Sequence, residues 1–162
     1  MSRASKLSSK KLHPKGEAPN FTRFRSSSEQ ASRHLASIKS SGSKAECLLR
    51  SVLWRRGLRF RKNVSTLPGK PDIVFSTERV AVFCDGDFWH GRHWTKNKAR
   101  LAAGPNAAYW VAKIARNRER DKICQRQLRQ TGWCVLRFWE SDILDRPMDI
   151  ADCVTQHLRT FS

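Results

Sequence analysis

Two short apolar runs, separated by a brief polar connection, constrain the fold of this chain more than any other feature. The runs cover Ile73 to Phe75 and Val80 to Cys84, and the polar residues 76–79 lie between them. Short apolar runs bounded by turn-forming residues are typical of buried strands. A connection this short favours an antiparallel hairpin, which we expect to form part of a central sheet.

Helical periodicity surrounds the hairpin. Apolar residues recur at helical spacing from about residue 45 to residue 56, and Gly57 is expected to end that helix. The same reasoning predicts a long helix from about residue 106 to residue 131, ended by Gly132, and a last helix over residues 148–159. Helices therefore both precede and follow the hairpin.

A third apolar run and an entry helix complete the expected order. Trp133 to Trp139 lacks regular polar–apolar alternation, which predicts a strand buried on both faces. A short helix is expected from about Glu29 to Lys39. Because strands and helices are intermixed, we expect an α/β fold in which helices flank a small central mixed sheet.

The chain carries a large excess of positive charge. Of its 162 residues, 32 are lysine or arginine and 14 are aspartate or glutamate, for a formal net charge of +18. This charge predicts a polyanionic partner, and the lack of a long apolar run favours nucleic acid over a membrane. We expect one domain at residues 29–162 and a disordered basic tail at residues 1–28, which would solubilise the protein or contact phosphates.

The cysteines indicate a reducing compartment. Their number, 5, is odd, and no two of them have the CxxC spacing. Most lie inside apolar segments, so we expect reduced core residues in a cytosolic protein.

Two carboxylates flank the open end of the expected hairpin, opposite its turn. Asp72 opens the first strand and Asp85 follows the second, so both lie at strand ends of a neighbouring pair. Phosphodiester hydrolysis uses a hard cation held by carboxylates, and Mg²⁺ prefers such oxygen ligands. Glu46 lies on the apolar side of its helix, where it either joins this site or pairs with an arginine.

These residues carry a resemblance to a nuclease family. Glu46, Asp72 and a second acid resemble the PD-(D/E)xK pattern, although no lysine follows the second acid. Residues 83–90, which read F-x-D-G-x-F-W-H, resemble the very short patch repair (Vsr-type) mismatch endonucleases. The resemblance covers about residues 30–145, with further matching segments at residues 32–38, 67–72, 110–121 and 132–140.

The resemblance implies a restriction-endonuclease-like fold and a role for each site residue. Asp72 would be the principal Mg²⁺ ligand, with a main-chain carbonyl from Cys84, and His90 would be the general base. Asp85, where the best-known member has a histidine, would bind metal or orient water. Glu46 would belong to the same catalytic group.

Two aromatic residues and an apolar one imply recognition of distorted DNA. Phe88 and Trp89 match an aromatic wedge that enters the base stack, and Leu35 would approach from the opposite groove. Packing in the core is the alternative for the two aromatics. Asn117 and Asp121, polar residues on the buried stripe of the long helix, would serve a structural role or hydrogen-bond toward the site.

No structural zinc is expected, although the best-known member of the family holds one. Its ligand positions correspond here to Asp87, Arg92, Trp94 and Ser141, which do not form a zinc-binding set. His93 is expected to be a surface residue or to contact phosphate.

We therefore expect a Mg²⁺-dependent endonuclease that nicks double-stranded DNA at T:G mismatches left by deamination of 5-methylcytosine. A Vsr-like nuclease used for restriction or defence, and a non-catalytic basic DNA-binding module, are the alternatives. The resemblance further implies a monomer in the bacterial cytoplasm, associated with the nucleoid, that hands the nick to mismatch-repair proteins and a DNA polymerase.

Overall fold

The computed structural model of the chain describes residues 42–104 and 106–160. The tail at residues 1–28, the helix expected at residues 29–39 and Leu35 lie outside these ranges. The elements in chain order are α2 (Lys44–Arg55), β1 (Arg61–Lys62), β2 (Ile73–Phe75), β3 (Val80–Asp85), α3 (Trp94–Ala102), α4 (Ala107–Gln130), β4 (Cys134–Trp139), α5 (Glu140–Asp145) and α6 (Pro147–Thr160).

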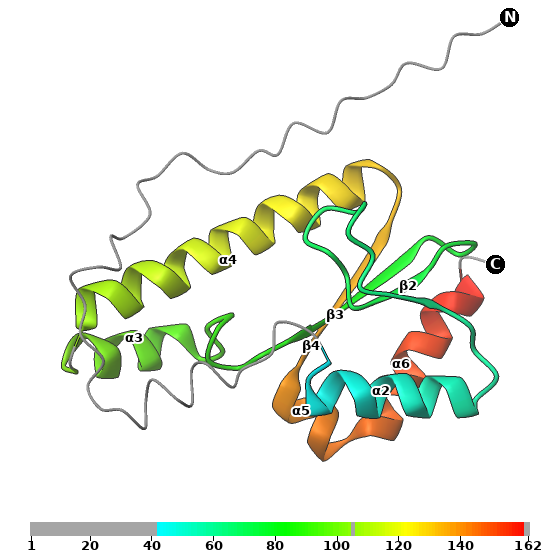
Figure 1. Ribbon diagram of the computed structural model, residues 1–162, viewed down its shortest axis with the longest axis horizontal. Helices are drawn as coiled ribbons and strands as arrows, with labels where there is room; N and C mark the ends of the chain where they lie inside the picture. The colour runs from blue at the N-terminus through cyan, green and yellow to red at the C-terminus, as the bar shows by residue number, and fades with distance from the viewer. Residues whose placement is uncertain (1–41, 105, 161–162) are drawn as a thin grey trace, which may run out of the picture.

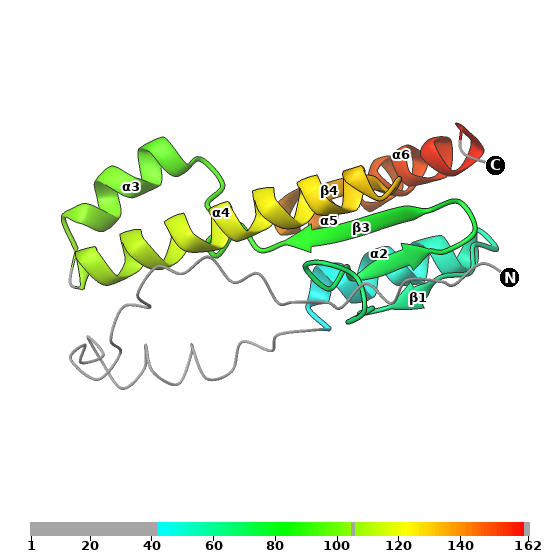
Figure 2. The same ribbon diagram turned by 90° about the horizontal axis from the view of Figure 1, so that it is seen from above.

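The four strands form one mixed sheet in the order β1-β2-β3-β4; Figure 1 labels β2, β3 and β4, and Figure 2 labels β1. β2 and β3 pair antiparallel, which confirms the expected hairpin. β4 returns through the long helix α4 and pairs parallel with β3, so that Asp85 lies opposite Trp139. The expected mixed sheet with flanking helices is therefore present.

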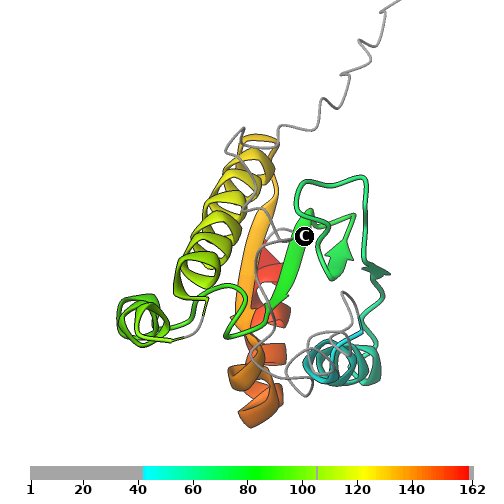
Figure 3. The ribbon, with the colours of Figure 1, turned by 60° about the vertical axis from the view of Figure 1, so that its left-hand side comes forward.

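Side chains of β3 alternate between two apolar layers. Val80 and Val82 point into a cluster formed with α2, α5 and α6, whereas Ala81 and Phe83 pack against Leu128 of α4. Figure 3 shows α4 on one side of the sheet and α6 on the other. The sheet thus forms the middle layer between two sets of helices.

One part of the molecule extends beyond the sheet. Helix α3 and the first turns of α4 run together past the end of β3 (Figure 2), and none of the residues of α3 is buried. The loop that joins β3 to α3, residues 86–93, therefore connects the sheet to this projection.

Three expectations about local structure were wrong or incomplete. β4 is not buried on both faces: only Val135 is fully buried, because β4 is an edge strand and carries Arg137 in its middle. β1, α3 and α5 were not predicted. The cysteines are unpaired as expected, but none is fully buried and Cys47 is exposed.

Within the described part of the chain, no helix is both long enough and apolar enough to cross a membrane.

Candidate active site

Antiparallel pairing of β2 and β3 brings Asp72 to the carboxyl end of β3. The backbone N–H of Asp72 donates to the carbonyl oxygen of Val82 at 3.0 Å. In return, the N–H of Cys84 donates to Oδ2 of Asp72 at 2.8 Å. Asp85 is the next residue of β3. The two acids singled out from the sequence therefore lie at the same end of two neighbouring strands.

The surroundings of Asp72 make its negative charge costly. Burial, followed by the nearby carboxylates of Glu46 and Asp85, raises the pKa of Asp72 to about 6, against the lowering effects of the Cys84 N–H and of Arg50. A bound cation would offset this cost. Mg²⁺ commonly takes one or two protein carboxylates and completes its shell with water and substrate phosphate, so this position fits a hard divalent cation.

The thiol of Cys84 does not suit such a cation. Burial, followed by the charge of Asp72, raises the pKa of this thiol well above its ordinary value. It therefore remains protonated at neutral pH, and a neutral thiol is a poor ligand for Mg²⁺. Of the two groups that Cys84 could offer a cation, this favours the main-chain carbonyl over the sulfur.

Glu46 stabilises the start of α2 and pairs with an arginine. Its carboxylate accepts hydrogen bonds from the N–H groups of Gly42 at 2.8 Å and Ser43 at 3.3 Å, completing a capping box. It also pairs with Arg50 at 3.0 Å, and Arg50 in turn donates to the carbonyl oxygen of Asp72 at 2.9 Å. The arginine alternative for Glu46 is thus present in the structure, next to Asp72.

His90 is held by an acid of α4. Its Nδ1 lies 2.5 Å from Oδ2 of Asp121. A hydrogen bond from His90, with the charge of Arg137, lowers the pKa of Asp121 despite the opposing effect of burial. Because an ionised carboxylate only accepts hydrogen bonds, Nδ1 of His90 is the donor in this contact.

The loop that carries His90 has a second anchor on α4. The side-chain amide of Asn117 donates to the carbonyl oxygen of Trp89 at 3.0 Å. Asn117 and Asp121, one helical turn apart, therefore hold two consecutive residues of the loop. Of the two roles left open for these residues, the structure shows the one directed toward the site.

Arg137 of β4 links Asp85 and Asp121, and it was not predicted from the sequence. Its guanidinium donates to both carboxylate oxygens of Asp85, each at 2.6 Å, and lies 3.4 Å from Asp121. His90 is also close to Asp85, at 3.6 Å. Since Arg137 occupies both oxygens of Asp85, this carboxylate is better placed to orient neighbouring side chains than to bind a metal alone. A charged residue within an otherwise apolar strand was the available signal.

If this site carries out the phosphodiester cleavage that the sequence resemblance implies, removing the charge of Asp121 should impair it without loss of the fold. Asp121→Asn should then lower the single-turnover cleavage rate by roughly 100-fold, because a neutral amide can donate or accept and so does not fix the orientation and tautomer of His90. Rates under saturating enzyme would measure this, with Asp149→Asn, an exposed acid of α6, as the matched control. A rate close to that of the wild type would show that His90 works without Asp121.

The aromatic residues of the loop form an exposed cluster with α4. Phe88 lies 5.2 Å from Trp89 and 5.5 Å from Trp110, measured between ring centroids. Phe88 is nevertheless 39% exposed. Phe88 is thus packed against two aromatic rings and still exposed to solvent. It is neither a core residue nor part of an unpacked loop. The contact with Trp110 was not anticipated.

Asp87, Arg92 and Ser141 are joined to one another directly. Arg92 donates to Asp87 at 3.1 Å, to Asp142 at 2.8 Å and to the hydroxyl of Ser141. The hydroxyl and backbone N–H of Ser141 donate to Asp87 at 2.7 and 3.0 Å. An ion-pair cluster therefore ties the loop after β3 to the start of α5. Trp94 lies outside it and packs under Arg118, 5.4 Å from the ring centroid.

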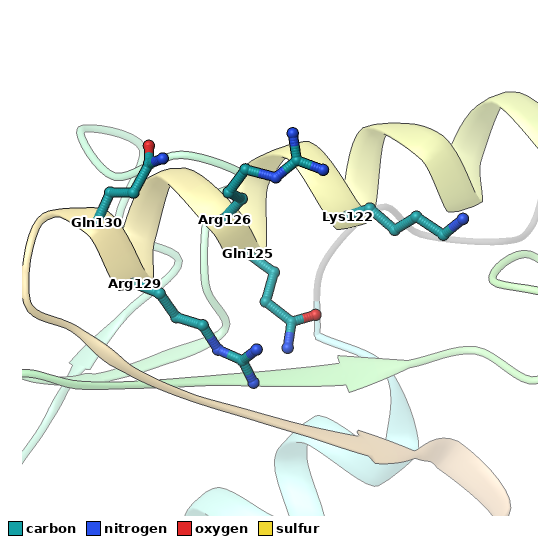
Figure 4. A pocket seen from close by; sticks show the side chains of 5 residues that line it. All are labelled: Lys122, Gln125, Arg126, Arg129 and Gln130. Carbon is teal, nitrogen blue, oxygen red and sulfur yellow. The ribbon is translucent and has the colours of Figure 1, made fainter.

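The exposed side of α4 adds a basic surface. Figure 4 shows five long side chains projecting from the last turns of this helix. They line a shallow hollow of about 520 Å³, namely Lys122, Gln125, Arg126, Arg129 and Gln130. These residues include three cations and two amides but no acid, which suits contact with a phosphate backbone. The surface begins one residue after Asp121.

Comparison with known proteins identifies clear relatives. A family profile described as DNA mismatch endonuclease Vsr matches residues 25–96. The type II nicking enzyme V.NmeDIP of Neisseria meningitidis serogroup C is 43% identical over 131 residues, which cover 81% of this chain and 87% of that protein. The type II nicking enzyme V.HpaIIP of Haemophilus parainfluenzae is 42% identical over 112 residues, which cover 69% of this chain and 78% of that protein. The DNA mismatch endonuclease Vsr of Escherichia coli (strain K12) is 32% identical over 127 residues, which cover 78% of this chain and 80% of that protein.

Proposed function

The chain belongs to the Vsr family of DNA mismatch endonucleases, and we propose that it nicks double-stranded DNA at T:G mismatches in a Mg²⁺-dependent reaction. Its mixed sheet with flanking helices is the restriction-endonuclease-like core of that family. That it is a DNA-nicking endonuclease follows from its relatives. The preference for a T:G mismatch, the need for Mg²⁺ and the roles of the individual residues are what we propose.

The observation that carries the proposal is the placement of a histidine–aspartate pair next to a buried carboxylate. His90 bonds to Asp121 at 2.5 Å and lies 3.6 Å from Asp85, the neighbour of the Asp72 site. Nε2 of His90 would take a proton from the attacking water. Mg²⁺ bound by Asp72, with the Cys84 carbonyl, would polarise the scissile phosphate.

Asp85 and Glu46 support this centre from two sides. Asp85 orients Arg137 and lies within reach of His90, so we propose that it positions the attacking water or the metal's water shell. Glu46 holds Arg50, which donates to the main chain of Asp72. Both acids also make the Asp72 position more negative and hence more attractive to a cation.

Metal dependence is tested with one labelled duplex that contains a T:G pair. Nicking in Mg²⁺ and none in excess chelator is the expected result. Equal nicking with and without chelator would overturn the metal assignment.

The mismatch preference is assigned to the aromatic cluster. An inserted ring unstacks a base step at a cost of a few kcal/mol, and a mispaired step is easier to open. Phe88 and Trp89 are the proposed wedge because they stand beside His90 and Phe88 is exposed. In the same proposal, Leu35 acts from the other groove, DNA polymerase and mismatch-repair proteins use the nick, and the enzyme is a monomer of the bacterial cytoplasm.

Loss of one wedge ring should reduce selectivity more than chemistry. We expect Trp89→Ala to lower the ratio of T:G to C:G nicking roughly tenfold, since stacking of a base on an aromatic ring contributes about 1–3 kcal/mol. The ratio of kcat/KM values on matched duplexes measures it. Trp54→Ala serves as the control, because Trp54 is an exposed aromatic of α2 outside the site. An unchanged ratio in Trp89→Ala would remove this residue from the wedge.

A further inference from the structure

A hollow beside the Phe88 ring presents hydrogen-bond donors that the proposed chemistry does not use. Its volume is about 450 Å³, and its lining comes from the loop after β3, from α3 and from the start of α5. His93, Asn97 and Arg100 form the wall on the α3 side. Because Phe88 also lines this hollow, a molecule bound there would touch the proposed wedge.

Asp87, the one acid that lines the hollow, already accepts hydrogen bonds, whereas the side chain of one of the two lining arginines has no such partner in the described chain. Asp87 accepts hydrogen bonds from Arg92 at 3.1 Å and from Ser141 at 2.7 Å, and the same bonds lower its pKa against the effect of burial. The side chain of Arg100 makes no hydrogen bond or ion pair with any residue of the described chain. Among the residues that line the hollow with Phe88, Arg100 therefore carries a positive charge with which no acid of the described chain pairs.

Helix α3 has the composition of a contact surface. It buries no residue, and its sequence WTKNKARLA contains three cations and no acid. Asn97 is held in place because its amide donates to the carbonyl oxygen of Arg92 at 2.6 Å, and its second N–H is left for a ligand.

We propose that this hollow binds a DNA backbone phosphate next to the base step that Phe88 enters. Arg100 is the principal ligand, through the paired N–H groups of its guanidinium, and Asn97 and His93 add further donors. The site rests on the proposed function, since Phe88 must meet DNA for the hollow to face a phosphate. A phosphate held here would fix the register of the wedge on the duplex.

A thermodynamic cycle tests this site: it combines the Arg100→Ala substitution with DNA duplexes that each carry one neutral methylphosphonate linkage. Each linkage removes the charge of one phosphate near the mismatch. The His90→Ala protein provides uncut complexes in Mg²⁺ and is compared with the same protein that also carries Arg100→Ala. We expect Arg100→Ala to raise Kd roughly tenfold and to lower the slope of log Kd against log salt by about one. One methylphosphonate position should raise Kd similarly in the parent and leave the Arg100→Ala protein unaffected.

Two further variants separate a specific contact from general charge loss. Lys98 is a cation of the same helix that does not line the hollow, so Lys98→Ala should stay sensitive to that methylphosphonate. Arg100→Lys should keep part of the coupling, because it retains the charge but not the fork. An Arg100→Ala protein that is as sensitive as the parent at every linkage, or that has an unchanged Kd, would overturn the site.

Failure of the proposed function would be seen separately. In that case, wild-type protein would bind and nick unmodified T:G and C:G duplexes equally. The coupling between Arg100 and one phosphate would still be read from the modified duplexes.

Discussion

Replacing His90 by alanine is expected to lower the single-turnover rate of nicking by roughly 10²–10⁴-fold, the usual contribution of a general base. The imidazole is held on Asp121 at 2.5 Å, and no other histidine approaches these acids in the described chain. Binding of the duplex should change little, because the aromatic cluster and the basic surfaces remain. Quench-flow or manual sampling with excess enzyme gives the rate, and fluorescence anisotropy gives Kd.

The control for this variant is a histidine outside the site. His157 bonds to the carbonyl oxygen of Cys153 within α6 at 2.8 Å, so His157→Gln should keep the wild-type rate. If His90→Ala nicks as fast as the His157 variant, the general base lies elsewhere.

The Asp72→Asn variant should be inactive and yet more stable at alkaline pH. Burial raises the pKa of Asp72 from 3.8 to about 6, so the folded protein binds this proton more tightly than the unfolded chain. Its ionised form therefore destabilises the fold above pH 6, by up to about 3 kcal/mol. Asparagine removes that charge and keeps an oxygen to accept the N–H of Cys84.

Because the pKa of Asp72 is raised in the folded protein, its ionised form destabilises the fold more as pH rises. At pH 8 the free energy of unfolding of Asp72→Asn should exceed that of the wild type by about 2–3 kcal/mol. The difference should shrink as pH falls from 6 toward 4, where wild-type Asp72 becomes protonated in both states. Urea unfolding at pH 8 and pH 5 measures it, and addition of Mg²⁺ should stabilise only the wild type. A variant that is less stable at pH 8 would contradict the assigned environment of Asp72.

The local elements were predictable because their signals are local. Apolar spacing placed α2, α4 and α6 within a few residues of their observed bounds, and the two apolar runs became the hairpin β2-β3. β1 is only two exposed residues long, and α3 buries nothing. Neither therefore leaves the apolar periodicity on which such predictions rest.

The pairings of the proposed catalytic residues depend on contacts between distant parts of the chain. Asp121 stood out as a polar residue on a buried helical stripe, but its partner His90 comes from a loop 31 residues earlier. Arg137 reaches Asp85 only because β4 pairs parallel with β3. The β4 burial prediction failed for a related reason, since the apolar pattern does not reveal that a strand lies at the sheet edge.

Recognition of a T:G mismatch by a Mg²⁺-dependent nicking centre can be measured by comparing two duplexes. Wild-type enzyme and Mg²⁺ are incubated with two duplexes that differ only in a T:G or a C:G pair within a cytosine-methylation site, and the nicked strand is quantified. We expect a nick in the T-containing strand of the T:G duplex and very little nicking of the C:G duplex. Equal nicking of both duplexes would contradict this expectation and would favour a role in restriction or defence.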